Sequence, residues 1–353
     1  MGFKRLEADD FVVSAQAQTS TAWTGNLPTL TTFFTQSSQV VGASGEYYVT
    51  VFNSDPTGSD AEAQFEIAYG NETGGGTYDY NHSAVPGVSP SKTIYGQYRT
   101  LVLEDENSSF VWGDSNTGSA DNDFYVISIE RARYKQSLLP GSLNLILSSS
   151  DAAYDSIKLT DDSNMVTLPT YYGTMRAYQL ISGSDGKSWD GGNGWTANSG
   201  SYGLVLPDIS TILLNGAALS GSGAGSGGIN IGTSLTADDF GDNPTKLYTA
   251  LTGSSLFTPA VNVFELNSQE TLTSDYVFIR ARNSEYNYTE NPSFISGSTG
   301  EVVFPYFINN PQTFPTTVGL YNDSNDLLAV AKLSRPIQKD FTKEALIRVK
   351  LDF

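Results

Sequence analysis

The sequence contains no cysteine and a single histidine among its 353 residues. Without cysteine the chain can form no disulfide, has no thiolate nucleophile, and cannot hold zinc or an iron–sulfur cluster through sulfur. A catalytic triad built on histidine would have to use His82, which lies in a polar loop. A lone loop histidine is more often a solvated side chain than a catalyst.

Long apolar runs are missing as well. No segment approaches the roughly 20 consecutive apolar residues that a membrane-spanning helix needs. The first ten residues lack the apolar stretch of a signal peptide. We therefore expect a soluble protein that is made in the cytoplasm and has no membrane partner.

Basic residues are scarce. Lys and Arg number 19 against 38 Asp and Glu, which gives a net charge of −19. Such a charge repels phosphate backbones and opposes the counterion release that drives nucleic-acid binding. We expect no nucleic-acid partner and interpret most of the acidic residues as a solvated surface that limits aggregation.

Glycine and aromatic residues are plentiful instead. The chain has 34 Gly, 20 Tyr and 18 Phe, while hydrophobic residues make up 39% of it. Apolar burial must therefore rely on aromatic side chains more than on aliphatic helices. The length allows two or three cores, because single domains usually hold about 100–200 residues. We expect a mainly β protein with β-sandwich-like domains and a few short helices.

Several segments have the residue types and partial alternation of half-buried strands. Residues 47–52 and 63–69 flank the turn-rich stretch 53–59 and are expected to form an antiparallel pair. Further strands are expected at residues 124–129, 143–147, 175–181 and 202–206.

The C-terminal region has the clearest pattern. Residues 316–321 and 327–333 bracket the polar stretch 322–326, which predicts a hairpin with a five-residue loop. The final run alternates, which predicts a strand with two different faces. One face carries Ala345, Ile347, Val349, Leu351 and Phe353, and the other carries Leu346, Arg348, Lys350 and Asp352. A strand of this kind needs a sheet to cover it, either its own or a neighbour's.

Three segments indicate helices. Ser89 followed by Pro90 predicts an N-cap and first turn for a helix over residues 90–103, although Gly96 weakens that helix by about 1 kcal/mol relative to alanine. Its apolar face would hold Ile94, Tyr95, Tyr98, Leu101 and Val102. Shorter helices are expected over residues 208–214 and 243–251.

Composition suggests how the chain divides into domains. Residues 1–88 form an N-terminal β region and residues 89–218 a central domain with a helix and strands. Residues 219–232 form a Gly/Ser-rich loop or linker, and residues 233–353 form a C-terminal β region that ends in the hairpin and terminal strand. The segment 219–232 is either a domain boundary or a surface loop.

Four arginines occur in two similar contexts. An aromatic and aliphatic strand leads into Arg131-Ala132-Arg133, and a similar strand leads into Arg280-Ala281-Arg282. The likeness indicates either two related β units or a chance match. Because arginine suits two-pronged contacts to carboxylates, these side chains are candidates for interface anchors, with internal ion pairs as the alternative.

Three aromatic residues complete the candidate interface. Trp189 and Trp195 lie in a glycine-rich loop, and Phe353 ends the terminal strand. Such side chains bury much area when a partner covers them, and exposed rings of Trp and Tyr also stack on sugars. The loop therefore fits either subunit contacts or recognition of a glycan.

Motifs that carry chemistry are not found. No Gly-x-Ser-x-Gly elbow sits in a strand–turn–helix setting, and the segment 185–188 lacks the glycine that a phosphate-binding loop requires at position 181. The loops 185–193 and 322–326 are rich in oxygen atoms but lack the calcium-binding pattern. We expect no catalytic residue, no cofactor and no metal.

Adjacent carboxylates are a further possibility, since pairs of acids drive glycoside hydrolysis. Neighbouring residues on a strand point to opposite faces, however, and turn or capping roles are the more common use of such pairs. The pairs in question are Asp9-Asp10, Asp161-Asp162 and Asp238-Asp239.

Several stretches together resemble a family. Residues 89–99, 131–135, 291–294 and 318–322, with the end of the chain, are similar to a virion structural protein of contractile-tailed, T-even-like marine phages such as those that infect cyanobacteria. The likeness extends over nearly the whole chain. It implies a virion component made in the host cytoplasm and present in many symmetric copies, with the tail baseplate as first placement and the neck or capsid surface as second. It carries no catalytic residues.

The expected function is therefore structural and non-enzymatic. The partners would be other virion proteins and copies of the chain itself, arranged as a symmetric oligomer within the particle. The alternatives are a module that binds host glycans and, less favoured, an enzyme that cleaves them.

Overall fold

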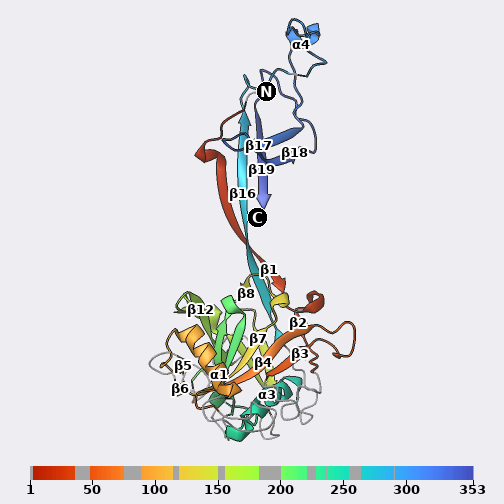
Figure 1. The fold of residues 1–353 in the computed structure, drawn as a ribbon. Coiled ribbons are helices and arrows are strands. Elements are labelled where there is room, and N and C mark those ends of the chain that lie inside the picture. Colours follow the sequence, from red (N-terminus) through yellow and green to blue (C-terminus); the bar gives the residue numbers. More distant parts are fainter. Residues whose placement is uncertain are drawn as a thin grey trace. The chain divides into compact units, whose positions relative to one another are not determined.

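A computed structural model describes residues 3–35, 48–74, 89–113, 119–149, 156–182, 200–220, 228–235, 237–253, 264–289 and 291–352. The fold is mainly β, with antiparallel sheets and few short helices, as the sequence predicted. Its contacts divide the chain into two compact units (Figure 1). Unit 1 consists of Met1–Ala17 and Thr271–Phe353, and unit 2 of Gln18–Glu270.

The division differs from the one that composition suggests. The expected boundaries near residue 88 and at 219–232 both lie inside unit 2, because strands from either side of them pair with one another. The described ends of the segment 219–232 pack into the core, with Leu219, Ile229 and Ile231 all buried. The Ile229 amide donates a hydrogen bond to the Leu219 carbonyl. Both described ends of the segment therefore belong to the body of unit 2.

Unit 2 is built on an eleven-stranded sheet that curls into a half-barrel. The strands run in the order β2-β15-β9-β10-β12-β13-β14-β7-β4-β3, with β11 paired to β12. Their bounds are β2 (Thr29–Leu30), β3 (Tyr48–Phe52), β4 (Ala63–Asn71), β7 (Asp123–Ile129), β9 (Asn144–Ser148), β10 (Ser156–Asp161), β11 (Thr170–Tyr172), β12 (Met175–Ser182), β13 (Gly203–Leu206), β14 (Thr211–Asn215) and β15 (Phe264–Glu265). All of the strands expected from residues 47 to 206 are present, and β3 and β4 form the expected antiparallel pair.

Alternation along the central strands gives the sheet two apolar faces. On β7, Tyr125, Ile127 and Ile129 belong to one buried cluster, and Phe124 and Val126 belong to the other. Successive side chains of a strand point to opposite faces, so β7 is covered on both sides. A strand buried on both faces has to be apolar throughout, which explains the run of residues 124–129.

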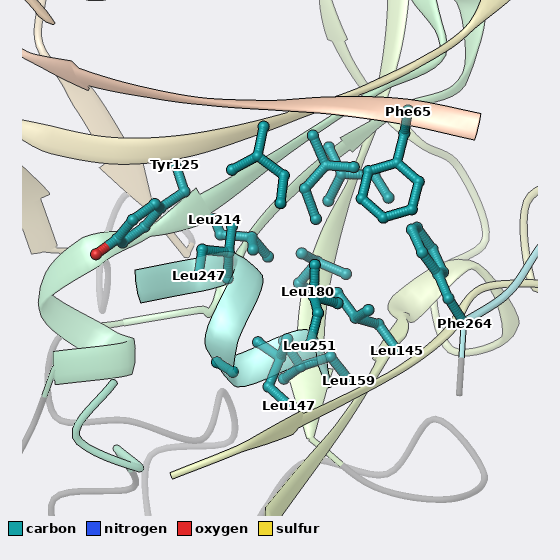
Figure 2. Packing of buried hydrophobic residues seen from close by; sticks show 14 of the residues in the cluster. Phe65, Tyr125, Leu145, Leu147, Leu159, Leu180, Leu214, Leu247, Leu251 and Phe264 are labelled. Atoms are coloured by element: carbon teal, nitrogen blue, oxygen red, sulfur yellow. The ribbon is translucent and has the colours of Figure 1, made fainter. Parts of the chain in front are cut away.

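The larger cluster lies between the sheet and α3 (Asn243–Thr252). Leu247 and Leu251 of α3 belong to it together with Leu180 and the leucines of β9 and β10 (Figure 2). The rings of Phe65 and Phe264 pack edge to face in the same cluster. The short helix α2 (Gly216–Ser220) adds Ala218 and Leu219. The sequence correctly predicted α3, with its proline in the first turn.

The smaller cluster covers the other face of the sheet with α1 (Pro90–Tyr98) and the pair β5 (Phe110–Trp112) and β6 (Ser119–Asp121). The Ser89 side chain caps α1 by accepting a hydrogen bond from the Lys92 amide, and Pro90 occupies the first turn as predicted. The helix continues as a π-helical turn over Arg99–Leu103. Leu101, which the sequence placed on the apolar face, is 44% exposed because this change of winding turns it outward.

The helix expected over residues 208–214 is wrong. The short 3-10 turn Pro207–Ile209 leads instead into β14, whose five residues are all buried. β14 pairs with β13 on one side and β7 on the other. A short continuous apolar run that contains a β-branched pair, Thr211-Ile212, fits a central strand as well as a helix, and the neighbouring strands decide between them.

Two long strands, β1 (Phe11–Thr21) and β16 (Asn267–Ala281), contribute residues to both units. They belong to a sheet in the order β1-β16-β19, and β8 (Ser137–Leu138) pairs with the first residues of β16. β19 (Ala345–Asp352) pairs with β16 from Ser274↔Asp352 to Ala281↔Ala345. The alternation predicted for the terminal strand is confirmed, since Val349 is buried while Leu346, Arg348, Lys350 and Asp352 are exposed.

The predicted hairpin of unit 1 is confirmed too. β17 (Thr317–Tyr321) pairs with β18 (Leu327–Lys332), and the register shifts at Leu320 and Tyr321. The loop closes on Asn322, whose side-chain oxygen accepts from the amides of Ser324 and Asp326. Unit 1 also contains the short helix α4 (Pro305–Asn309).

Candidate assembly surface

Unit 1 has very little apolar core. Within its described residues, the buried apolar side chains are Val277, Phe307 and Val349. All buried residues of the two large clusters belong to unit 2. A segment of this size normally depends on apolar burial for its stability, so unit 1 must be held by other contacts.

Large apolar side chains of unit 1 lie at the surface instead. Fifteen of the exposed large apolar residues described in the chain belong to it, against nine in the much longer unit 2. They are Phe3, Phe11, Val12, Val13, Tyr288, Val303, Tyr306, Ile308, Phe314, Tyr321, Leu327, Leu328, Val330, Phe341 and Leu346. Single exposed apolar residues are ordinary, whereas contiguous patches of them are common at interaction sites.

The hairpin carries a continuous part of this surface, which we call the hairpin patch: Phe3, Tyr321, Leu327 and Val330. The rings of Phe3 and Tyr321 meet edge to face with centroids 5.0 Å apart. Tyr321 and Leu327 both lie over Gly319, where a Cβ would come within 2.8 and 3.3 Å of them. Val330 pairs with Gly319 across the hairpin. Gly319 thus makes room for two side chains that are 45% and 52% exposed.

The unit 1 part of β1 is uncovered on both faces. Phe11 and Val13 on one face are 49% and 69% exposed, and Val12 on the other is 47% exposed. In an ordinary two-layer sheet one face would be packed against a core. The exposure of both faces means that unit 1 itself supplies no second layer here.

A polar contact takes part of the role that a core would have. Lys339 is 1% exposed, and its ammonium group donates to the carbonyls of Asn283 (3.0 Å) and Asp340 (3.0 Å) and to Oδ1 of Asn287 (2.8 Å). These three oxygens match the three donors of a lysine. The contact ties the segment after β16 to the segment before β19. Near the N-terminus, Lys4 similarly bonds the Arg280 carbonyl and pairs with Glu285 at 2.9 Å.

Aromatic rings organise the segment that includes α4. Phe294 packs edge to face on Phe304 and Phe307, with centroids 5.1 and 5.7 Å away. Phe307 is 7% exposed, whereas Tyr306 and Ile308 on the same short helix are 62% and 63% exposed. The segment therefore buries the ring of Phe307 and presents the side chains of Tyr306 and Ile308 to solvent.

Charge is divided unevenly between the units. Unit 1 contains 10 basic and 12 acidic residues, a net charge of −2, and unit 2 contains 9 basic and 26 acidic residues, a net charge of −17. Nearly all of the acidic excess thus lies in unit 2. Copies of unit 2 repel one another, whereas copies of unit 1 do so only weakly.

The first arginine pair predicted as interface anchors has internal partners. Arg133 is half-buried and pairs with Glu62 at 2.8 Å, with the Thr24 hydroxyl also in contact. Arg131 is exposed, bonds the Tyr134 carbonyl at 2.8 Å and lies over the Tyr134 ring. A hydrogen bond from Thr24 and the charge of Arg133 lower the pKa of Glu62. Arg133 thus forms an ion pair within its own chain, which was the alternative to an interface role.

The second pair lies at the end of β16. Arg280 and Arg282 are both exposed, and the Arg282 amide donates to Glu285 at 2.8 Å. The likeness of the two Arg-Ala-Arg segments does not extend to their structure, since Arg131–Arg133 is a 3-10 turn and Arg280 still belongs to a strand.

Trp189, Trp195, Phe353 and His82 lie outside the described residues. The interface role of the four arginines, two tryptophans and Phe353 stays a prediction.

The carboxylate pairs that the structure describes serve local structure. Asp10 accepts from the Glu7 amide at 2.9 Å at the start of a 3-10 turn. Asp161 accepts from the amides of Gly141 and Ser163, and Asp162 accepts from the Gln179 amide at 2.9 Å. The side chains of Asp238 and Asp239 are outside the described set. Among the described residues no cluster of three or more His, Cys, Asp or Glu could hold a metal ion.

Asp162 makes the stability of unit 2 depend on pH. Burial, with a smaller contribution from the charge of Asp161, raises the pKa of Asp162 to about 6. Between the usual value near 4 and this raised value the folded state binds more protons than the unfolded state, so the free energy of unfolding falls as pH rises from about 4 to about 6, by at most about 3 kcal/mol. Asp162→Asn keeps an oxygen for the Gln179 amide and removes this loss.

We therefore expect Asp162→Asn to stabilise the protein at pH 7 more than at pH 4.5. Urea unfolding followed by tryptophan fluorescence measures this in unit 2, because all four tryptophans belong to it. Asp60→Asn, at an exposed carboxylate of the same unit, is the matched control. An equal effect of Asp162→Asn at both pH values would contradict the assignment.

Sequence reasoning did not find the hairpin patch or the exposed apolar residues of β1. A signal was present, because residues 327–331 are apolar at successive positions, and a surface hairpin with one covered face alternates instead.

Within the described residues no helix is long and apolar enough to span a membrane. Comparison of the chain with protein-family models, with curated proteins and with solved structures finds no match.

Proposed function

We propose that this chain is a non-enzymatic structural component of a contractile-tailed phage virion, located in the tail baseplate, and that it acts by protein–protein assembly. The neck or the capsid surface is the second placement. The observation that carries the assembly role is the surface of unit 1: apolar strands that are exposed while few apolar side chains are buried. The virion placement rests on the resemblance of residues 89–99, 131–135, 291–294 and 318–322.

The surface chemistry favours assembly over catalysis. Obligate interfaces are rich in aromatic and aliphatic side chains, and unit 1 offers both from its strands and from α4. Asp162, whose pKa is raised, accepts from the Gln179 amide, and Asp208, whose pKa is lowered, pairs with Arg176. The proposed partners are other virion proteins and further copies of the chain.

The test is quantitative mass spectrometry of purified virions from cells in which the protein is made during infection. We expect the chain to be present at a fixed copy number that is a multiple of the particle's symmetry, and a density map of the particle to place it. Absence from purified particles would overturn the proposal. So would a purified protein that turns over a substrate, or one whose sole binding partner is host polysaccharide.

A further inference from the structure

We infer that the exposed strand surface of unit 1 is the contact between copies of this chain, so that unit 1 completes its core only when a second copy covers it. The inference deepens the proposed function by naming the partner. It rests on the assembly role that the proposed function assigns to the chain. The surface consists of the hairpin patch with Leu328, the apolar residues of β1 from Phe11 to Val13, and Leu346 of β19.

The first reason is area. The fifteen exposed apolar side chains of unit 1 are between 45% and 69% exposed. With about 100 Å² accessible on each, which is about half of what a large side chain buries, they offer roughly 1,500 Å² of apolar surface. A stable complex of standard size buries about 800 Å² on each partner. The nine residues of the proposed surface supply about 900 Å² of this area, which is enough for a stable contact.

The second reason is the lack of a core. Unit 1 buries few apolar side chains among its described residues and uses the ammonium group of Lys339 where apolar contacts would ordinarily be. Small domains with too little core are commonly completed by oligomerisation. A covering layer from another chain would turn the uncovered faces of β1 and the hairpin into an interior.

The third reason is charge, which favours a copy of the same chain over a different partner. A surface of one dominant sign would indicate a partner of the opposite sign, but unit 1 carries both signs almost equally, with a net charge of −2. On β19, for example, Lys350 pairs with Asp352 at 2.8 Å. Two copies of unit 1 can approach without strong repulsion, while the net charge of −17 on each unit 2 disfavours contacts there.

The test uses the full-length purified protein and two matched double variants. Leu328→Lys with Val330→Lys changes two residues of β18 that are 67% and 61% exposed. Leu168→Lys with Leu235→Lys changes two residues of unit 2 that are 75% and 82% exposed. Both double variants add the same charge at exposed leucine or valine positions, so a general effect of charge on solubility or association appears in both.

Mass in solution is measured by light scattering and sedimentation equilibrium at micromolar concentrations. We expect the mass of the wild type to be 38.0 kDa multiplied by two or by a larger whole number. The unit 1 variant should weaken association at least 100-fold, and the unit 2 variant should match the wild type. A monomeric wild type overturns the inference, and so does a unit 1 variant that associates as tightly as the wild type.

A second measurement covers the case in which the unit 1 variant does not fold. The chain lacks cysteine, so Ser324→Cys in the exposed hairpin loop gives a single labelling site. Donor-labelled and acceptor-labelled copies of the Ser324→Cys protein, which is otherwise wild type, should show energy transfer when mixed, and unlabelled protein should compete it away. Absence of energy transfer overturns the inference. If the purified chain is monomeric but is found in virions, this inference fails while the proposed function stands.

Discussion

The Gly203→Ala variant should fail to form the sheet of unit 2. Gly203 has φ +150°, and a Cβ at this position would lie 1.9 Å from the carbonyl oxygen of Leu213 and 2.9 Å from the Cα of Leu214. Both are backbone atoms of the paired strand β14, which is itself fixed between β13 and β7. Neither strand can move away without breaking the centre of the sheet. We expect a loss of more than about 4 kcal/mol, the range of severe core defects.

Gly96→Ala is the matched control. Gly96 lies inside α1, where a Cβ would meet nothing within 4 Å. Alanine in a helix interior is favoured over glycine by about 1 kcal/mol, so this variant should be slightly more stable than the wild type. Tryptophan fluorescence and circular dichroism during urea unfolding compare the two. A Gly203→Ala protein as stable as the wild type would show that the approach of β13 and β14 is wrong.

Phe65→Ala should produce the second largest loss of stability. Phe65 on β4 is fully buried, and its ring lies beside that of Phe264 (Figure 2). The ring centroid of Phe65 is 5.3 Å from that of Phe264, edge to face, and 6.1 Å from that of Trp23. The three rings connect β4, β15 and the segment after β1, and Trp23 also donates to the Phe264 carbonyl at 2.6 Å. Truncation leaves a cavity that these elements cannot close, and a buried Phe→Ala change costs about 3–5 kcal/mol.

Two variants calibrate this result in the same unfolding assay. Phe65→Leu keeps most of the buried volume and should lose less than the alanine variant. Leu168→Ala, at a residue of unit 2 that is 75% exposed, should change stability by no more than about 0.5 kcal/mol. If Phe65→Ala behaved like Leu168→Ala, the ring cluster would not hold β4 and β15 together.

Local pattern predicted much of this fold. The turn between residues 53 and 59 selected the β3–β4 pair, and Asn322 with its polar neighbours selected the β17–β18 hairpin, because turn chemistry acts over a few residues. The strand at 211–215 was mistaken for a helix, since its burial comes from strands β13 and β7 rather than from its own sequence. The two units could not be predicted either, because unit 1 joins residues that are more than 250 positions apart.

The position of the candidate surface could not be predicted from the sequence. Sequence reasoning expected arginine anchors, and Arg133 turned out to have an internal carboxylate partner within reach. Whether an arginine is satisfied inside its own chain depends on residues such as Glu62, which are distant in the sequence. Leu327, Leu328 and Val330 of β18 were assigned to a hairpin strand, and whether that strand is covered was not predicted.

The arrangement of unit 1 also sets the order in which the molecule can be made. Its sheet requires β1 from the beginning of the chain and β19 from residues 345–352, with all of unit 2 between them. During synthesis unit 2 is complete before β19 has left the ribosome, and domains generally fold as they emerge. Until then the sheet that contains β1, with its exposed apolar residues, lacks β19. The sheet of unit 1 is therefore complete only after the whole chain has been made.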